Sequence, residues 1–345
     1  MSENTASANL KDLPAGTAAQ SSPTRDFTSG NRPAKLAIVG AGAVGSTLAY
    51  AAAIDGVAPE IALYDINAER VKAEALDIAH GAQFTPGAEV VGSDDIQVCK
   101  DADMVVVTAG AAQKPGQDRL DLAKSTVSLM KKLIPQLQSV APEAIYMMVT
   151  NPVDVVTYAS LKISGLPRNR LFGSGTVLDT SRLRYHVANH TGVAIKSVHA
   201  YICGEHGDSE IPLWSSASIG NVPLEQWGPT LSGGLFDQGL MDSIAKDVVN
   251  SAYEIIAGKG ATNYAIGLAS TSIIRAVLRD EHRVQTLSTL LEDWHGISDV
   301  CMAAPTVTGR DGAGRVLATP LTLKERDGLT NSAVRLREVA RSLGF

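Results

Sequence analysis

A glycine-rich turn near the N-terminus constrains the fold of this chain more than any other feature of its sequence. The apolar run Lys35–Val39 predicts a buried strand, and a helical pattern over Ala43–Asp55 follows it. Between them lies the segment Gly40-Ala-Gly-Ala-Val-Gly45. A second predicted strand, Glu60–Tyr64, ends at Asp65, 20 residues after the last of these glycines. This order of strand, glycine turn, helix and strand-terminal acid is typical of a dinucleotide-binding unit.

Each residue of the turn has a physical role in that interpretation. Gly40 permits the tight turn, Gly42 lets the backbone approach a pyrophosphate, and Gly45 allows close packing of helix on strand. Backbone amides at the helix start, including that of Val44, would hold the phosphates. Asp65 would accept hydrogen bonds from the adenosine ribose and would repel a 2′-phosphate, and no arginine follows it directly. The cofactor expected is therefore NAD rather than NADP. A tight turn without a ligand is the alternative.

The rest of the chain divides into two parts that differ in the pattern of predicted helices and strands. Apolar runs alternate with helical patterns as far as residue 175: a helix over Asn67–His80, a strand near Glu89–Val91, and continuous apolar strands at Asp103–Thr108 and Ala144–Val149. Beyond it, helical stretches near 176–190, 236–258, 262–277 and 322–342 are separated by short β-rich pieces, Val198–Ile202 and Arg283–Ser288. The fold class expected is α/β, with a doubly wound parallel (Rossmann) sheet over 35–175 and an α+β substrate domain over 176–345. Residues 1–34, rich in small and polar residues, are expected to be a mostly disordered tail.

Composition removes several classes of function. The 345-residue chain has a formal net charge of −6 and no dense cluster of lysine and arginine, so nucleic acid and anionic membrane are poor partners. No apolar window is long enough for a membrane span. The three cysteines, Cys99, Cys203 and Cys301, form no CxxC pair, which fits reduced thiols better than disulfides or a metal site. With no secretory h-region and an acid-containing N-terminus, a cytoplasmic location is expected.

Three later segments place polar residues where ligands bind in open α/β sheets, beyond the carboxyl ends of strands. The segments are Thr108–Leu122, which reads as a mobile flap, Thr150–Asp154, and the pair Asp179–Arg184 with Gly204–Asp208. A histidine in such a place is suited to proton transfer, because its unperturbed pKa of about 6.5 lies near neutrality.

The motifs that carry these residues resemble the L-lactate dehydrogenase family, bacterial type. The glycine turn, AGAAQKPGQDRLDL, TNPVDVV, GSGTVLDTSRLRY and GEHGDSE occur in the family's order and spacing. The resemblance runs from about residue 35 to the C-terminus, and single motifs are shared with malate dehydrogenases. It implies hydride transfer between a nicotinamide and C2 of a small 2-hydroxy acid, and suggests a homotetramer.

Site roles follow from the resemblance, residue by residue. His206 corresponds to the general acid/base, and Asp179 to the carboxylate that orients it. Arg182 corresponds to the arginine that grips the substrate carboxylate with two parallel hydrogen bonds. Arg119 corresponds to the flap arginine that polarises the substrate carbonyl, and Asn151 to a donor to the same oxygen beside the nicotinamide. For each, a solvated or purely structural side chain is the alternative.

Two further positions bear on substrate choice. Gln113 stands where related malate dehydrogenases carry an arginine that pairs with a second carboxylate, so the resemblance favours pyruvate and lactate over oxaloacetate and malate. Thr262 corresponds to a residue that shapes the pocket for the substrate's C3 group, or serves only in helix packing. A malate dehydrogenase, another 2-hydroxy-acid dehydrogenase and a catalytically silent NAD-binding module are the competing interpretations; the last would be marked by loss of the histidine or the flap arginine.

A regulatory site is also suggested. On a helix, Arg184 points away from Arg182 and cannot serve the same ligand. His199 lies on the predicted strand Val198–Ile202. Bacterial members of the family use an arginine and a histidine at these positions to bind fructose 1,6-bisphosphate across a subunit interface. An interface ion-pair set without an effector is the alternative.

Overall fold

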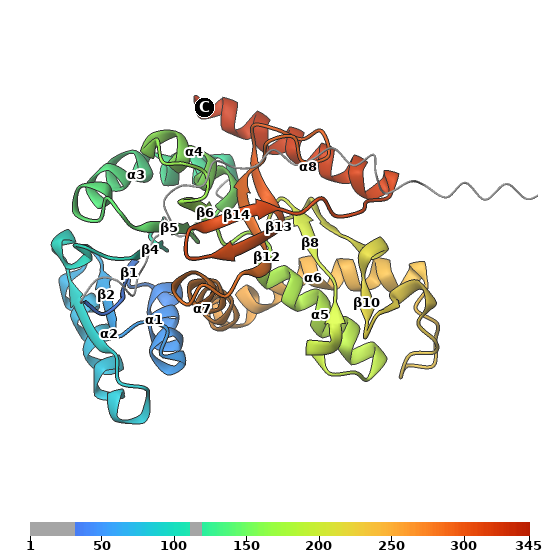
Figure 1. Ribbon diagram of the computed structural model, residues 1–345, viewed down its shortest axis with the longest axis horizontal. Helices are drawn as coiled ribbons and strands as arrows, with labels where there is room; N and C mark the ends of the chain where they lie inside the picture. The colour runs from blue at the N-terminus through green and yellow to red at the C-terminus, as the bar shows by residue number, and fades with distance from the viewer. Residues whose placement is uncertain (1–31, 111–118) are drawn as a thin grey trace, which may run out of the picture.

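A computed structural model describes residues 32–110 and 119–345 (Figure 1). The predicted parallel sheet is present, with strand order β3-β2-β1-β4-β5-β6 and every neighbouring pair parallel. Its strands are β1 (Lys35–Val39), β2 (Glu60–Tyr64), β3 (Glu89–Ser93), β4 (Met104–Val107), β5 (Ile145–Met148) and β6 (Leu171–Gly173). Its connecting helices are α1 (Ala43–Asp55), α2 (Ala68–His80), α3 (Arg119–Val140) and α4 (Val153–Ser164). This is the Rossmann order, and it confirms the predicted fold class.

The sequence explains why these strands lie inside. Every residue of β4 and β5 is buried, as expected for continuous apolar runs covered by helices on both faces. α2, by contrast, buries only Val71 and Ala75 completely. Because little packing stabilises it, its N-terminal cap matters more. Asn67 provides it, because its side chain accepts a hydrogen bond from the Arg70 amide at 3.0 Å.

The second half of the chain extends the same sheet. β6 pairs with β12 through Gly173 and Ser288, and the order continues β12-β13-β8-β9 with antiparallel pairing, while β14 joins β13. Its helices are α5 (Val177–Thr191), α6 (Gln238–Lys259), α7 (Tyr264–Leu278) and α8 (Leu323–Ser342). Its strands are β7 (Val198–His199), β8 (Ile202–Gly204), β9 (Glu210–Pro212), β10 (Ser218–Ile219), β11 (Val222–Pro223), β12 (Arg283–Leu290), β13 (Cys301–Gly309) and β14 (Gly312–Val316).

The two halves also share a hydrophobic core. α7 comes from the second half but packs beside α1, as Figure 1 shows. Ile273 and Ile274 of α7 lie in the same buried cluster as Leu36 of β1 and Leu48 of α1. The nucleotide-binding end and the second half are therefore joined by a continuous sheet and by packed apolar side chains.

Two local predictions were wrong. Val198–Ile202 is not one strand: β7 pairs with β10 in a separate three-stranded sheet, whereas β8 belongs to the large sheet. The break falls where the carbonyls of Ala200 and Tyr201 accept hydrogen bonds from the Arg184 side chain and the Leu213 amide. The segment Thr108–Leu122 is also not a loop throughout, because α3 begins at Arg119.

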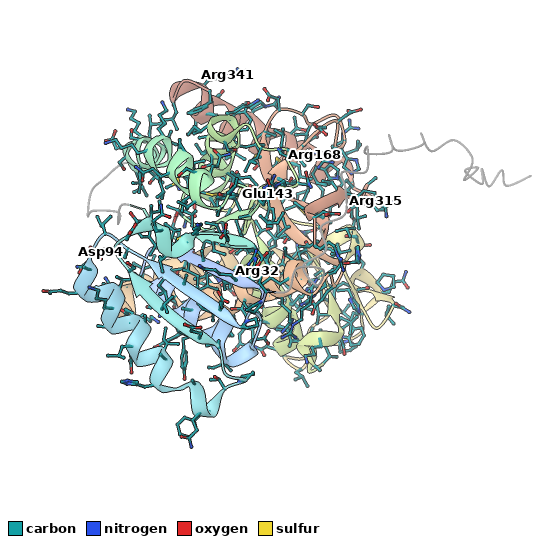
Figure 2. All side chains as sticks on the ribbon, turned by 60° about the vertical axis from the view of Figure 1, so that its left-hand side comes forward. Arg32, Asp94, Glu143, Arg168, Arg315 and Arg341 are labelled. Carbon is teal, nitrogen blue, oxygen red and sulfur yellow. The ribbon has the colours of Figure 1, made fainter. Side chains whose placement is uncertain are left out.

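The described surface carries charges of both signs at separate places. Exposed Asp94 follows β3, whereas exposed Arg315 lies on β14 and exposed Arg341 on α8 (Figure 2). Arg32 pairs with Asp103 at 2.8 Å, which joins the start of the described chain to the residue before β4. Among the described residues, no helix combines the length and the apolar character that crossing a bilayer requires.

Candidate active site

The three segments after β1, β4 and β5 meet at one edge of the sheet. The Thr108 hydroxyl donates to the carbonyl of Gly40 at 3.0 Å, which joins the end of β4 to the glycine turn. The Thr150 hydroxyl donates to the carbonyl of Ala109 at 2.8 Å, which joins the segment after β5 to the segment after β4. The predicted site edge is therefore assembled as parallel-sheet topology requires.

The glycine turn has the shape that a dinucleotide needs. Gly40 has φ +103°, and a Cβ there would lie 2.8 Å from the Ala109 nitrogen. A Cβ on Gly45 would lie 1.8 Å from the Gly40 carbonyl oxygen, so α1 could not approach β1 this closely. A Cβ on Gly42 would meet nothing within 4 Å, and no side chain of the described residues caps α1. The start of α1 thus carries amides without a side-chain cap beside a glycine that leaves open space, the arrangement that binds a pyrophosphate.

Asp65 lies beside this turn, at the end of β2. One carboxylate oxygen accepts the Ala41 amide at 2.7 Å, and the other accepts the Asn67 amide at 2.9 Å. The side chain therefore fixes the turn itself. Each oxygen keeps a second lone pair that can accept a ribose hydroxyl.

His206, Asp179 and Arg182 form one charged cluster. Nδ1 of His206 lies 2.6 Å from one oxygen of Asp179, and Nη1 of Arg182 donates to the other at 2.8 Å. Asp179 and Arg182 lie one turn apart on α5, whereas His206 lies in the segment after β8. Asp179 is 2% exposed, but the His206 side chain is 25% exposed and can meet a ligand. The cluster brings together three residues that the sequence placed in two separate motifs.

The charges around His206 favour its protonated form. The negative charge of Asp179 raises the pKa of His206 to about 9, although burial acts in the opposite direction. Burial opposes ionisation of Asp179, but His206 and Arg182 hold the pKa of that carboxyl below its usual value. An imidazole with this partner can hold a proton at neutral pH and release it in a more alkaline range.

Two further carboxyls near His206 were missed at the level of sequence. Asp154 of α4 accepts the His206 backbone amide at 2.7 Å. A carboxylate oxygen of Glu210 of β9 lies within 4.8 Å of a carboxylate oxygen of Asp179 and of a ring nitrogen of His206. The buried Oε1 of Glu210 has no hydrogen-bond partner among the described residues. Burial, followed by the charge of Asp179, raises the pKa of Glu210 to about 9, so this carboxyl is neutral at pH 7. Asp154 lies in the motif TNPVDVV and Glu210 in GEHGDSE. The apolar neighbours of Asp154 were the one signal in the sequence that this acid is buried.

The other predicted site residues are less fully placed. Asn151 is exposed and lies two residues before the start of α4, at the same edge of the sheet. Thr262 precedes α7 instead of lying on it, and the adjacent Asn263 donates to Thr47 of α1 at 2.9 Å. Gln113 lies outside the described residues. Arg119 is the first residue of α3.

The side chain of Arg184, one of the two predicted effector residues, contacts the backbone next to the other, His199. Arg184 is half-buried on α5, its Nε donates to the carbonyl of Ala200 at 2.9 Å, and its guanidinium lies 5.2 Å from the Tyr201 ring centroid. His199, the residue before Ala200, is exposed on β7. Arg184 also lines a cavity of about 350 Å³ together with Lys196 and Arg283.

A Rossmann sheet with this glycine turn, and a carboxylate-paired histidine on a connected second half, define the class of dinucleotide-dependent oxidoreductases. Comparison with known proteins agrees with that class. A sequence model of the lactate/malate dehydrogenase NAD binding domain matches residues 34–173, and one of the family's alpha/beta C-terminal domain matches residues 176–342. The chain belongs to the lactate/malate dehydrogenase family and is an NAD-dependent oxidoreductase.

Individual relatives are similar over nearly their whole length. An L-lactate dehydrogenase of Bifidobacterium animalis subsp. lactis is 56% identical over 314 residues, which cover 91% of this chain and 98% of the relative. One of Clostridium perfringens is 43% identical over 303 residues, covering 88% and 95%. The crystal structure of a minor L-lactate dehydrogenase from Enterococcus mundtii, in a ligand-bound form, has a TM-score of 0.85 at 36% identity and covers 90% of this chain and 98% of that one.

Proposed function

We propose that this protein is an L-lactate dehydrogenase that interconverts pyruvate and L-lactate. The observation that carries the proposal is the pairing of His206 with Asp179 on the second half, joined by a continuous sheet to a glycine turn shaped for NAD. The relatives at 56% and 43% identity, which are L-lactate dehydrogenases, support the same activity.

The proton chemistry follows from the charged cluster. NAD, when bound, supplies or accepts the hydride. In reduction, protonated His206 donates its proton to the oxygen that becomes the hydroxyl, and Asp179 stabilises the imidazolium before the transfer. In oxidation, neutral His206 takes the proton back. Arg182 uses one N–H on Asp179, and its remaining donors can hold the substrate carboxylate.

The remaining site residues are assigned by the motifs that contain them. We assign Arg119 and Asn151 to the substrate carbonyl, where positive charge and a donor stabilise the developing oxyanion. Thr262 would shape the space for the C3 group. Gly40, Gly42, Val44, Gly45 and Asp65 would hold NAD, and no step of the proposed chemistry calls for a metal.

Substrate choice is assigned to Gln113, on the sequence alone. A neutral glutamine leaves a second carboxylate without an ionic partner, which costs about 2–5 kcal/mol, or about 30- to several-thousand-fold in specificity. A methyl group carries no such penalty.

The test is a steady-state comparison of pyruvate, longer 2-oxo acids and oxaloacetate with NADH. We expect kcat/KM to be higher for pyruvate than for oxaloacetate. The variant Gln113→Arg should move the preference toward oxaloacetate, and Gln117→Arg, which adds the same charge to the same segment, should not. Faster turnover of oxaloacetate by the unmodified protein would refute the assignment.

We also propose regulation by fructose 1,6-bisphosphate at Arg184 and His199, in a cytoplasmic homotetramer. The cationic side chains Arg184, Lys196 and Arg283 around one cavity support an anionic ligand there. Millimolar effector should lower the apparent KM for pyruvate in phosphate-free buffer, and Arg184→Gln should abolish that change. An unaltered saturation curve, or a monomer in sedimentation, would contradict this part of the proposal.

A further inference from the structure

A buried carboxylate outside the proposed catalytic set holds the segment that carries His206. Asp154 is 2% exposed and lies in the first turn of α4. One of its oxygens accepts the His206 backbone amide at 2.7 Å, and the other accepts the Ser288 hydroxyl at 2.6 Å. A single side chain thus links α4, the segment after β8 and strand β12.

Hydrogen bonding alone does not explain why this residue is an acid. An asparagine could accept the same His206 amide with Oδ1 and donate to the Ser288 hydroxyl with Nδ2. It would do so without the cost of removing a charge from water. The negative charge therefore calls for a separate reason.

The charge is present in the pH range in which His206 titrates. Burial raises the pKa of Asp154 to about 6, and the hydrogen bonds from Ser288 and His206 limit that rise. Above about pH 6 the carboxyl is therefore ionised. The pKa of His206 is about 9, and Asp154 is among the groups that raise it, after Asp179.

We propose that Asp154 is a second positioning carboxylate for His206, which fixes its backbone and supplies negative charge that stabilises the imidazolium. The inference rests on the proposed function, in which His206 exchanges the proton. Asp179 acts on the ring directly, whereas Asp154 acts through the backbone and through its field.

Other ionisable groups around His206 must be kept constant in a test. Asp179 and Arg182 face it from α5 and Glu210 from β9, while Glu205 and Asp208 flank it in its own segment. Asp154 can be changed without altering any of their hydrogen bonds to the ring, because its own contact is to the His206 main chain.

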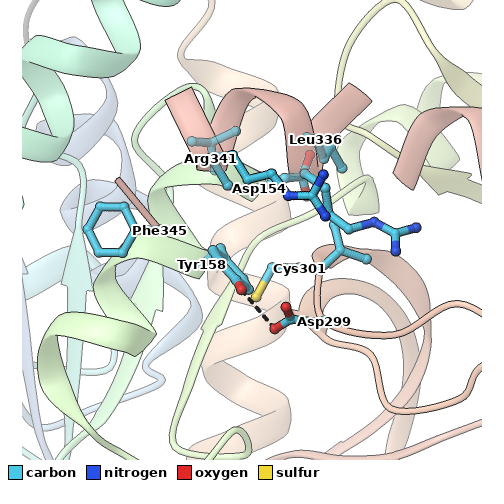
Figure 3. A pocket seen from close by; sticks show the side chains of 11 residues that line it. Asp154, Tyr158, Asp299, Cys301, Leu336, Arg341 and Phe345 are labelled. Atoms are coloured by element: carbon cyan, nitrogen blue, oxygen red, sulfur yellow. Dashed lines mark hydrogen bonds between the residues drawn. The ribbon is translucent and has the colours of Figure 1, made fainter. Parts of the chain in front are cut away.

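The chain offers a matched control. Asp154 and Asp299 line the same cavity of about 70 Å³, together with Tyr158 and Cys301 (Figure 3). The carboxylate of Asp299 accepts the Tyr158 hydroxyl at 2.7 Å and lies 3.3 Å from Nζ of Lys162. Removing its charge perturbs the same cavity but not the His206 segment.

The experiment compares Asp154→Asn and Asp299→Asn with the unmodified protein. The His206 ring is titrated by NMR in ligand-free protein labelled at histidine Cε1, with the resonance assigned through His206→Asn. We expect Asp154→Asn to lower the midpoint by about 0.5–1 pH unit, as loss of one nearby opposite charge does, and Asp299→Asn to leave it unchanged. The pH at which kcat/KM for pyruvate reduction falls should move by the same amount.

An unchanged midpoint in folded Asp154→Asn would overturn the proposal. If that variant does not fold, the reciprocal measurement decides, because coupling between two sites is mutual. The Asp154 titration, followed through the backbone ¹⁵N shift of residue 206, should move to higher pH in His206→Asn, and no movement would also overturn it. Since ring and carboxyl titrations need no substrate, failure of pyruvate turnover would refute the proposed function separately.

Discussion

The two ends of the site are built by different physical means. The dinucleotide end is made of backbone: Gly40, Gly42 and Gly45 leave room where a Cβ would collide or block a ligand. These glycines and Asp65 lie within one stretch of the chain, residues 35–65. The catalytic end is made of ionisable side chains gathered from α4, α5, β9 and the segment after β8. Added side-chain bulk should therefore impair the dinucleotide end, whereas a change of charge should alter catalysis at the other end.

The largest expected effect comes from removing the imidazole. His206→Asn should lower kcat for pyruvate reduction by about 10²–10⁴-fold, the usual contribution of general acid/base catalysis. NADH affinity, measured by fluorescence, should stay within about twofold, because the glycine turn is untouched. Loss of NADH binding together with turnover would show that the two ends are not separable, and retained turnover would remove His206 from the mechanism.

Arg182→Lys tests geometry while keeping the charge. Lysine cannot make two parallel hydrogen bonds to a carboxylate, and loss of one charge-assisted bond costs about 1.5–3 kcal/mol. The KM for pyruvate should therefore rise about 10- to 100-fold with little change in NADH affinity. An unaltered KM would mean that Arg182 serves Asp179 alone.

The dinucleotide end offers a matched pair of steric changes. Gly45→Ala places a Cβ against the Gly40 carbonyl and should lower the free energy of unfolding by about 1–3 kcal/mol, with or without NADH. Gly42→Ala places its Cβ in open space, so it should keep the stability and weaken only NADH binding. Thermal denaturation with and without NADH distinguishes the two, and equal effects of both variants would contradict the steric account.

The same contrast explains how much could be predicted from the sequence. β1, α1 and β2 were predicted to the residue, because they follow from local apolar patterns and glycines, whereas no bounds were predicted for α3, α4 and β6. His206 and Asp179 were assigned to the site through family motifs, and in the structure Nδ1 of His206 lies 2.6 Å from an oxygen of Asp179.

What the sequence did not reveal depends on contacts between distant segments. Asp154 meets His206 across 52 residues and Ser288 across 134, and no local pattern encodes such a pairing. The split between β7 and β8 likewise depends on Arg184, whose side chain takes the Ala200 carbonyl away from strand pairing.

The most direct test of the charged-cluster account is the pH dependence of kcat/KM in both directions. Reduction needs protonated His206, so it should fall as the pH rises through about 9, whereas lactate oxidation needs the neutral ring and should rise through the same midpoint. Midpoints near 6.5, the ordinary value for histidine, would contradict the claim that surrounding carboxylates set the proton affinity of this site.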